Sequence, residues 1–309
     1  DIIFLVLFFQ LITLFGNYFY EKIKIFPTSS KIVSNLIFSF GMGLGLFIVI
    51  LTVLAFLGLF NSIYVWLVVM ACGIIGLKNY KGLLSEFKLI NIQKLSLSRL
   101  EIFSILFIST LSFFYLIVGL SPTLDGDSLS SYLLLPKQYV LNSELSLVDF
   151  AVGSIYPQNG HLLISFGLLL KDQIFAQILI VWMMGNMSVL VIFLIGKYFF
   201  SRRIALFGAL IWYSMYSVAY PSATAKIDLA WAFFDLLSLY AFINWYFSKL
   251  KDRNINWLFL SGFLIGIASG IKQASFFTVL AMVLGIIFDH AKNRNLVSKV
   301  FLKNIFRSE

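Results

Sequence analysis

The chain has 309 residues, of which 60% are hydrophobic and only 12% are charged, and its mean hydropathy is +0.94. Soluble domains carry roughly 45–50% apolar and about 25% charged residues, so a water-soluble core could not bury this much apolar surface. The composition therefore predicts an integral membrane protein. The net charge of +9 does not indicate nucleic-acid binding, because the basic residues lie in short segments between apolar runs.

Apolar runs of about 20 residues predict transmembrane helices, because that length crosses the hydrocarbon core and a helix satisfies its own backbone there. In chain order, the predicted spans are 2–20, 32–60, 62–77, 102–120, 174–196, 204–220 and 229–247, and then a hairpin of two shorter runs, 257–270 and 274–288. The run 161–170 is too short to cross, so we expect an interfacial helix there. The single cysteine, Cys72, lies inside an apolar run, which excludes a disulfide framework and predicts a buried thiol.

The distribution of lysine and arginine predicts the orientation of these spans. If the loop 78–101 is cytoplasmic, the five segments on its side of the membrane hold 3, 5, 3, 3 and 5 of the 23 basic residues. The four others then lie on the outer side: Lys137, Lys171, Lys226 and Lys272. This asymmetry follows the positive-inside rule and makes 121–173 the longest extracytoplasmic segment.

Two aspartates one residue apart follow the span 102–120, within "SPTLDGDSLSSYLLLPKQYV", residues 121–140. The chain has only 14 acidic residues, and carboxylates at a membrane surface are costly to keep charged, so Asp125 and Asp127 are functional candidates. A structural alternative for Asp127 is the N-cap of the following helix, which we expect to be interrupted at Pro136.

A second acidic site lies in the short outer turn "YPSATAKID", which ends at Asp228. Asp235 follows on nearly the same helix face but about 10 Å deeper, and we expect it to have a structural partner on another helix. Lys226 lies two residues from Asp228, so an ion pair between them or a solvated turn is the alternative to a role in substrate binding. Lys272 interrupts an apolar hairpin, where an ammonium group needs an anion.

Three further polar residues of the outer segment are weaker candidates for a functional role. Lys137 lies beyond the two aspartates, and Lys171 lies in a polar turn where we expect it to be solvated. His161 follows "YPQNG", and a lone histidine is more often a hydrogen-bonded surface or capping residue than a functional one. With acids at unknown distances it does not make a zinc motif.

Carboxylates and ammonium groups at a membrane edge suit the transfer of a sugar from a lipid-linked phosphate. One carboxylate can serve as general base for the acceptor hydroxyl. The departing phosphate needs positive charge, from lysines or from a divalent cation, Mg²⁺ or Mn²⁺, held by Asp127 and Asp228. The sequence has no Walker loop and no glycine fingerprint after a strand, so we expect the donor to arrive through the lipid.

Five segments occur in an order that resembles the GT-C-type membrane glycosyltransferases, and more narrowly the bacterial relatives of protein O-mannosyltransferases and of the lipid A aminoarabinose transferase. The segments are "LDGDSLSSYLLLPKQYVLNSEL", "IYPQNGHLLISFGLLL", "VIFLIGKYFFSRRIALFGALIW", "AKIDLAWAFFDLLSLYAF" and "GFLIGIASGIKQASFF". The resemblance covers about residues 102 to 288. Two features depart from it: three extra helices precede the catalytic loop, which commonly follows the first helix in the family, and "YPQNG" stands where some members have a "KPP" cluster.

The resemblance implies that an aspartate of the first long outer loop is the catalytic base and that the donor is a polyprenyl-phosphate sugar. Asp125 is the better match, because it is closer to the end of the preceding helix, but spacing alone does not decide between Asp125 and Asp127. Lys272 would contact the lipid phosphate, and Asp228 would be the second acidic site. The predicted substrate-binding residues are Lys137, Tyr156, His161, Lys226, Asp228 and Lys272, and the pairs Pro136–Lys137 and Tyr156–Pro157 would shape the loop.

The predicted fold is an all-α polytopic integral membrane protein, a GT-C-like transmembrane helix bundle with a long outer loop that carries juxtamembrane helices. Residues 1–101 would form N-terminal transmembrane helices and a basic cytoplasmic loop. Residues 102–288 would form the catalytic core with the outer loop 121–173. Residues 289–309 would form a basic cytoplasmic segment, and we expect the chain to be a fragment that lacks C-terminal sequence.

The predicted activity is hexosyl or pentosyl transfer from a polyprenyl-phosphate donor to a glycan, lipid or protein acceptor of the cell envelope. We expect the reaction on the extracytoplasmic side of a bacterial plasma membrane, with membrane lipids as further partners and no nucleic acid. A transporter or flippase is the alternative, and it would need paired ionisable groups near the midplane and repeated halves. Asp235 is the one acid clearly within a span, and no repeat is visible. A non-catalytic scaffold is a third hypothesis. It predicts that the aspartates point into contacts with protein and not into a cavity.

Overall fold

The computed structural model describes residues 1–25, 31–78, 80, 97–248 and 253–305. These residues form helices and turns, with no β-strand among them. Four helices are long and apolar enough to cross a membrane, or five if one bent pair is counted as a span. The predicted all-α polytopic bundle is thereby confirmed. Most of the predicted cytoplasmic loop 78–101 and the last residues of 289–309 lie outside the described part of the chain.

The first three predicted spans form the helices α1 (Ile2–Ile23), α2 (Lys31–Phe56) and α3 (Ser62–Leu77). α1 and α2 have the length and hydropathy of a span, whereas α3 is short for a full crossing with 16 residues. Cys72 of α3 is only 2% exposed, so the predicted buried thiol is confirmed.

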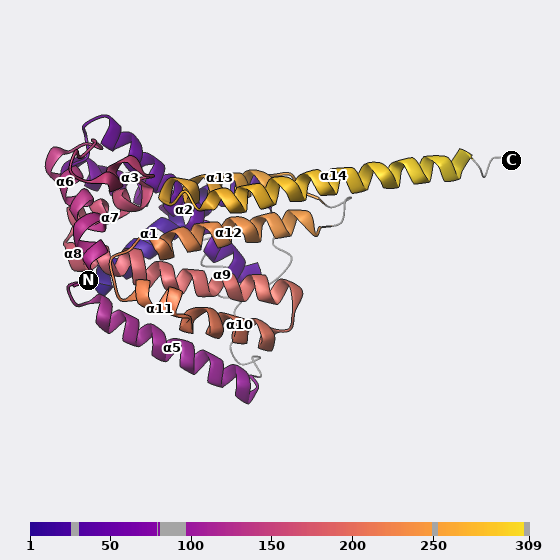
Figure 1. The fold of residues 1–309 in the computed structure, drawn as a ribbon, viewed down its shortest axis with the longest axis horizontal. Helices are drawn as coiled ribbons and strands as arrows, with labels where there is room; N and C mark the ends of the chain where they lie inside the picture. Colours follow the sequence, from indigo (N-terminus) through magenta and orange to yellow (C-terminus); the bar gives the residue numbers. More distant parts are fainter. Residues whose placement is uncertain (26–30, 79, 81–96, 249–252, 306–309) are drawn as a thin grey trace.

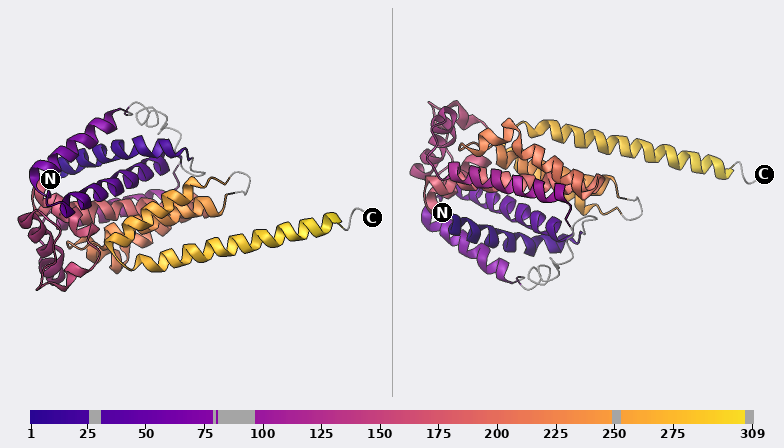
Figure 2. Two further views of the ribbon diagram at one scale, coloured as in Figure 1. Left: turned by 90° about the horizontal axis from the view of Figure 1, so that it is seen from above. Right: turned by 90° about the horizontal axis from the view of Figure 1, so that it is seen from below.

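The remaining bundle helices are α5 (Arg99–Gly119), α8 (Gln173–Gln177), the π-helix η4 (Ile178–Met183), α9 (Met184–Phe199), α10 (Arg202–Ser214), α11 (Tyr216–Ser222), α12 (Asp228–Tyr246), α13 (Asn256–Ile271) and α14 (Ser275–Ile305). α8, η4 and α9 run on as one span. The predicted hairpin is two helices, α13 and α14, with Lys272 in the break between them. In Figure 1 and in both views of Figure 2, α14 extends past the other helices toward the C-terminus.

The predicted span 204–220 consists of two helices, α10 and α11, which meet at a bend of 59°. Met215 at the bend has an extended backbone, with φ −65° and ψ 140°. The hydroxyl of Ser214 donates to the carbonyls of Leu210 and Ile211 and competes with the backbone for these acceptors at the end of α10. The bend brings α11 to the same end of the molecule as the outer loop (Figure 1).

The predicted outer loop 121–173 folds into η2 (Ser128–Tyr132), α6 (Leu134–Asn142), η3 (Val152–Ile155) and α7 (Asn159–Leu170). Figure 1 shows α6 and α7 at the end of the bundle where the N-terminus lies. The break that was predicted at Pro136 falls at Leu133 instead. Pro136 fits the first turn of α6, because the first N–H groups of a helix have no intrahelical acceptor.

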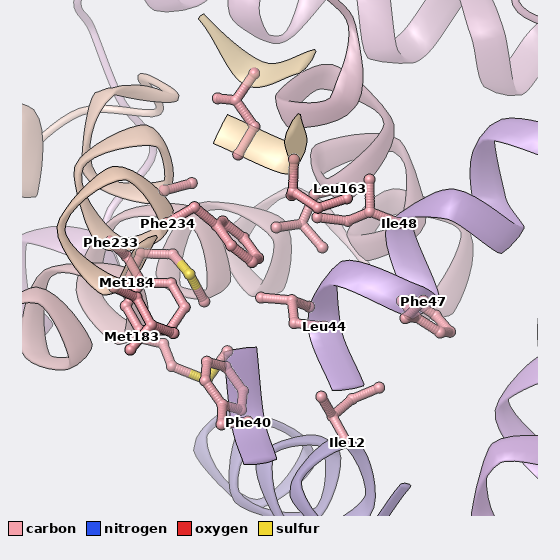
Figure 3. Packing of buried hydrophobic residues seen from close by; sticks show 14 of the residues in the cluster. Ile12, Phe40, Leu44, Phe47, Ile48, Leu163, Met183, Met184, Phe233 and Phe234 are labelled. Atoms are coloured by element: carbon pink, nitrogen blue, oxygen red, sulfur yellow. The ribbon is translucent and has the colours of Figure 1, made fainter. Parts of the chain in front are cut away.

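Buried apolar side chains fasten α7 to the membrane helices. Figure 3 shows Leu163 of α7 in the cluster that also contains Leu44 and Ile48 of α2. The ring centroid of Phe166 lies 4.8 Å from that of Phe47 and 5.0 Å from that of Phe8. The predicted interfacial helix at 161–170 is therefore packed into the bundle and gives the outer loop a rigid base.

At the opposite end of the bundle, Glu101 joins the start of α5 to the start of α10. Its carboxylate accepts hydrogen bonds from the Ser98 backbone N–H at 2.7 Å and from Arg202 Nε at 2.6 Å. Glu101 is only 3% exposed, so water does not replace these bonds when they are lost.

We expect Glu101→Ala to lower the melting temperature, because it removes the acceptor that joins Arg202 to the start of α5. Thermal unfolding in detergent micelles measures the change. The exposed Glu144 is the matched control, and Glu144→Ala should change stability by less than about 0.5 kcal/mol. Equal melting temperatures for Glu101→Ala and the wild-type protein would contradict this assignment.

Candidate active site

The acidic loop, residues 121–128, is held in shape by Asp125. The backbone N–H and the hydroxyl of Ser128 both donate to Asp125 Oδ2, each at 2.8 Å. Asp125 thus caps the helical turn that begins at Gly126. The predicted N-cap role of Asp127 is wrong, because its backbone is already helical and its side chain makes no capping bond.

Two hydrogen bonds join the acidic loop to the lysine turn, residues 223–228, and to the end of α11 just before it. Ser128 is fully buried, and its Oγ accepts a hydrogen bond from the Ala225 backbone N–H at 3.1 Å. The hydroxyl of Tyr220, just before the turn, donates to Asp125 Oδ1 at 2.5 Å. Two segments far apart in the sequence therefore form one side of the site.

Lys226 of the lysine turn faces both aspartates of the acidic loop. Its Nζ lies 2.8 Å from Asp127 Oδ2 and 3.7 Å from Asp125 Oδ2. It also lies 4.9 Å from the ring centroid of Tyr220, close enough for a cation–π contact. Burial alone would lower the pKa of Lys226, but the carboxylates outweigh burial and raise it, so the side chain stays charged. The expected ion pair between Lys226 and Asp228 is replaced by these contacts.

The partners of Asp125 predict a pH-dependent stability. Burial would raise its pKa, but the hydrogen bonds from Tyr220 and Ser128 and the charge of Lys226 outweigh burial and lower it. A carboxylate with a lowered pKa stabilises the fold above its unfolded pKa, about 3.9, and this contribution is lost as the pH falls through the folded value. Asp125→Asn should therefore lower the melting temperature at pH 7, and the difference from wild type should shrink below about pH 4. A difference that stays constant down to pH 3 would contradict this account.

The second ion pair of the site joins α12 to the break between α13 and α14. Lys272 Nζ donates to Asp228 Oδ1 at 2.5 Å, and both side chains are partly exposed. Asp228 is the first residue of α12, where the positive end of the helix dipole favours a carboxylate. Lys272 Nζ also lies 5.5 Å from the ring centroid of Trp231, one turn further along α12.

A cavity of about 760 Å³ lies between the outer loop and the break of the hairpin. Its polar lining residues are Asp127, Ser131, Tyr132, Tyr156, His161, Lys272 and Gln273. Phe276 and Phe277 at the start of α14 line it as well, and they are 63% and 74% exposed. The cavity thus combines a carboxylate, an ammonium group and an apolar rim on the helix that follows Lys272.

His161 is a buried wall residue of this cavity. It is 3% exposed, its ring stacks on Tyr132 with centroids 5.6 Å apart, and neither ring nitrogen has a hydrogen-bond partner among the described residues. Burial lowers its pKa to about 4, so the imidazole is neutral at ordinary pH. The surface or capping role that the sequence favoured for His161 is therefore wrong.

The structure does not bring all the predicted residues together. Asp127, Tyr156, His161 and Lys272 line the cavity, while Lys226 and Asp228 pair with Asp127 and Lys272. Asp125 does not line the cavity, and neither does Lys226, with which it forms an ion pair. Lys137 is exposed on α6 and does not line the cavity. Among the site residues that the sequence did not predict are Ser128, Tyr132, Tyr220 and Trp231.

The predicted metal ligands are each engaged with a lysine, Asp127 with Lys226 and Asp228 with Lys272. Within the described ranges, no three His, Cys, Asp or Glu side chains gather in a way that could hold a metal ion. In this arrangement the two carboxylates do not form a site that fits a divalent cation. The proposed role of Mg²⁺ or Mn²⁺ stays a prediction.

Removal of metal tests that prediction directly. If a cation acts at Asp127 and Asp228, EDTA should abolish the activity of the purified protein, and Mg²⁺ or Mn²⁺ should restore it. If the two lysines supply the positive charge instead, activity should stay within about twofold of its value before EDTA.

The fold and the site together define a multi-pass membrane protein with a cavity, lined by ionisable side chains, at one end of its helix bundle. Residues 157–305 match the model of the dolichyl-phosphate-mannose-protein mannosyltransferase family. The match supports a GT-C-type, mannosyltransferase-like membrane glycosyltransferase and confirms the resemblance seen in the motifs. It includes His161, Lys226, Asp228 and Lys272 but not the acidic loop. No curated protein and no solved structure gives a significant match.

Proposed function

We propose that the protein transfers a hexose or pentose from a polyprenyl-phosphate donor to a hydroxyl acceptor, with Asp127 as general base. The observation that carries this proposal is the cavity lined by both Asp127 and Lys272. The family match supports a glycosyltransferase, and the donor class, the base and the side of the membrane are our own proposals.

Exposure and contacts favour Asp127 over Asp125 as the base. The Asp127 side chain is 72% exposed, lines the cavity and has one partner, Lys226. The Asp125 side chain is 12% exposed, and both of its oxygens accept hydrogen bonds within the protein. A base must be free to take a proton from the acceptor, whereas Asp125 is suited to holding the loop in place.

The lysines supply charge for the leaving group. In the proposed step the acceptor oxygen bonds to the anomeric carbon of the sugar, and its proton passes to Asp127. The electron pair of the broken carbon–oxygen bond stays on the lipid phosphate, whose increased negative charge is stabilised by Lys272. Lys226 pairs with Asp127 and adds positive charge next to the proposed base.

The apolar rim of the cavity supports a donor that arrives through the lipid. Phe276 and Phe277 continue from Lys272 into α14, so a prenyl chain can lie against them while its phosphate meets the ammonium group. The positive-inside count supports an extracytoplasmic site, and the proposal of a bacterial plasma membrane rests on the resemblance of the motifs. The acceptor is proposed only as a glycan, a lipid or a protein hydroxyl.

Reconstitution tests the activity against the transporter alternative. The purified chain in liposomes should convert a labelled polyprenyl-phosphate hexose or pentose to free polyprenyl phosphate and a glycosylated acceptor. Movement of the intact donor across the bilayer without cleavage of the sugar bond would contradict the proposal. Asp235, on which a transporter would depend, instead receives a hydrogen bond from the neutral Thr278 at 2.8 Å, which confirms the expected structural partner.

A further inference from the structure

Three polar contacts connect α12 with the segment from Lys272 into α14. In order along α12 they are Asp228–Lys272 at 2.5 Å, Trp231–Ser275 at 2.8 Å and Asp235–Thr278 at 2.8 Å. The α12 residues of these contacts are three and four positions apart, which places them on one face of that helix. Their partners are three positions apart and likewise lie on one side of their segment. Such interhelical hydrogen bonds hold membrane helices in a fixed register.

The middle contact is the one that bears on Lys272. The indole N–H of Trp231 donates to the hydroxyl of Ser275, which is fully buried and therefore shielded from water. The backbone N–H of Ser275 donates to the carbonyl oxygen of Lys272 at 3.2 Å. The same indole ring lies 5.5 Å from Lys272 Nζ. Trp231 therefore contacts the ammonium group with its ring face and anchors the backbone next to it with its N–H.

We propose that Trp231 and Ser275 are positioning residues that keep the Lys272 ammonium at the cavity independently of Asp228. The inference rests on the proposed role of Lys272 toward the donor phosphate. A phosphate that binds Lys272 competes with Asp228 for the ammonium group. With Trp231 and Ser275 in place, Lys272 exchanges one anion for the other without a change in the backbone that carries it.

The inner contact provides a matched control. Thr278 makes a hydrogen bond of the same length to α12, from the same helix α14, but one turn further from Lys272. Ser275 and Thr278 both interact with Asp235, so the difference between them is the bond of Ser275 to Trp231. A merely structural role for Ser275 predicts that losing either bond has the same consequences. A positioning role predicts that only Ser275 affects binding at Lys272.

Binding of polyprenyl monophosphate to the full chain in detergent micelles separates these cases. Ser275→Ala and Trp231→Phe should each weaken binding about 3- to 10-fold, as expected for one lost hydrogen bond. Thr278→Val should bind within about twofold of wild type, although its melting temperature falls as well.

Two outcomes overturn the proposal: unchanged binding by Ser275→Ala and Trp231→Phe, or an equal loss in Thr278→Val. If the wild-type chain does not bind polyprenyl monophosphate, the proposed donor fails, and the acylation rate of Lys272 by a water-soluble reagent then decides the positioning role. Mass spectrometry of the Lys272 peptide should show at least about twofold faster acylation in Ser275→Ala than in Thr278→Val. Equal rates would overturn the inference by themselves.

Discussion

Asp127→Asn is expected to lower kcat for sugar transfer by about 10²- to 10⁴-fold, with a change of less than about threefold in the KM for the donor. The amide keeps the size and the hydrogen-bonding reach of the carboxylate but takes up no proton from the acceptor. Because Asp127 is exposed and does not cap the helix, we expect the melting temperature to stay close to that of wild type.

Asp125→Asn is the matched comparison, since it changes the same atoms two residues away. It removes acceptors for Ser128 and Tyr220 and should lower the melting temperature, with a smaller fall in kcat than Asp127→Asn. Full activity of a folded Asp127→Asn protein, together with an inactive but folded Asp125→Asn protein, would assign the base to Asp125.

Lys272→Met is expected to lower kcat/KM for the donor by about 10²- to 10³-fold, because the leaving phosphate loses its charged partner in the cavity. Methionine keeps the length and the apolar contacts of the lysine stem. Binding of polyprenyl monophosphate should weaken in parallel, and Asp228 should be left without its cation.

The control for charge alone is Lys171→Met, which removes one positive charge at the same end of the molecule. Lys171 contacts Asp1 and Asp172 and does not line the cavity. We expect it to change kcat/KM by less than about threefold. A comparable loss in both lysine variants would indicate a long-range effect of charge and not a specific contact with phosphate.

The membrane helices could be predicted from the sequence because the length of an apolar run is itself the physical requirement for a span. The bend at Met215 could not, because it depends on how Ser214 competes for backbone acceptors at the end of α10. The break in the outer loop was placed three residues too late, since Pro136 is tolerated within the first turn of a helix.

The acids and lysines of the site could be predicted because ionisable groups are scarce in this chain and costly near lipid. Their pairing could not, since the nearest charge in the sequence is not the nearest in space. Lys226 pairs with Asp127, 99 residues away, and not with Asp228, two residues away. Tyr220 and Trp231 were missed because aromatic residues make up 17% of the chain and carry no site-specific indication by themselves.

The central claim is that one cavity presents Asp127 and Lys272 to the same lipid-borne phosphate sugar. A structure of the full chain with a bound polyprenyl-phosphate sugar tests it most directly. The account predicts a phosphate oxygen within hydrogen-bond distance of Lys272 Nζ, and the sugar between that phosphate and Asp127. A phosphate bound at the opposite end of the bundle, beside Arg202, would contradict this claim.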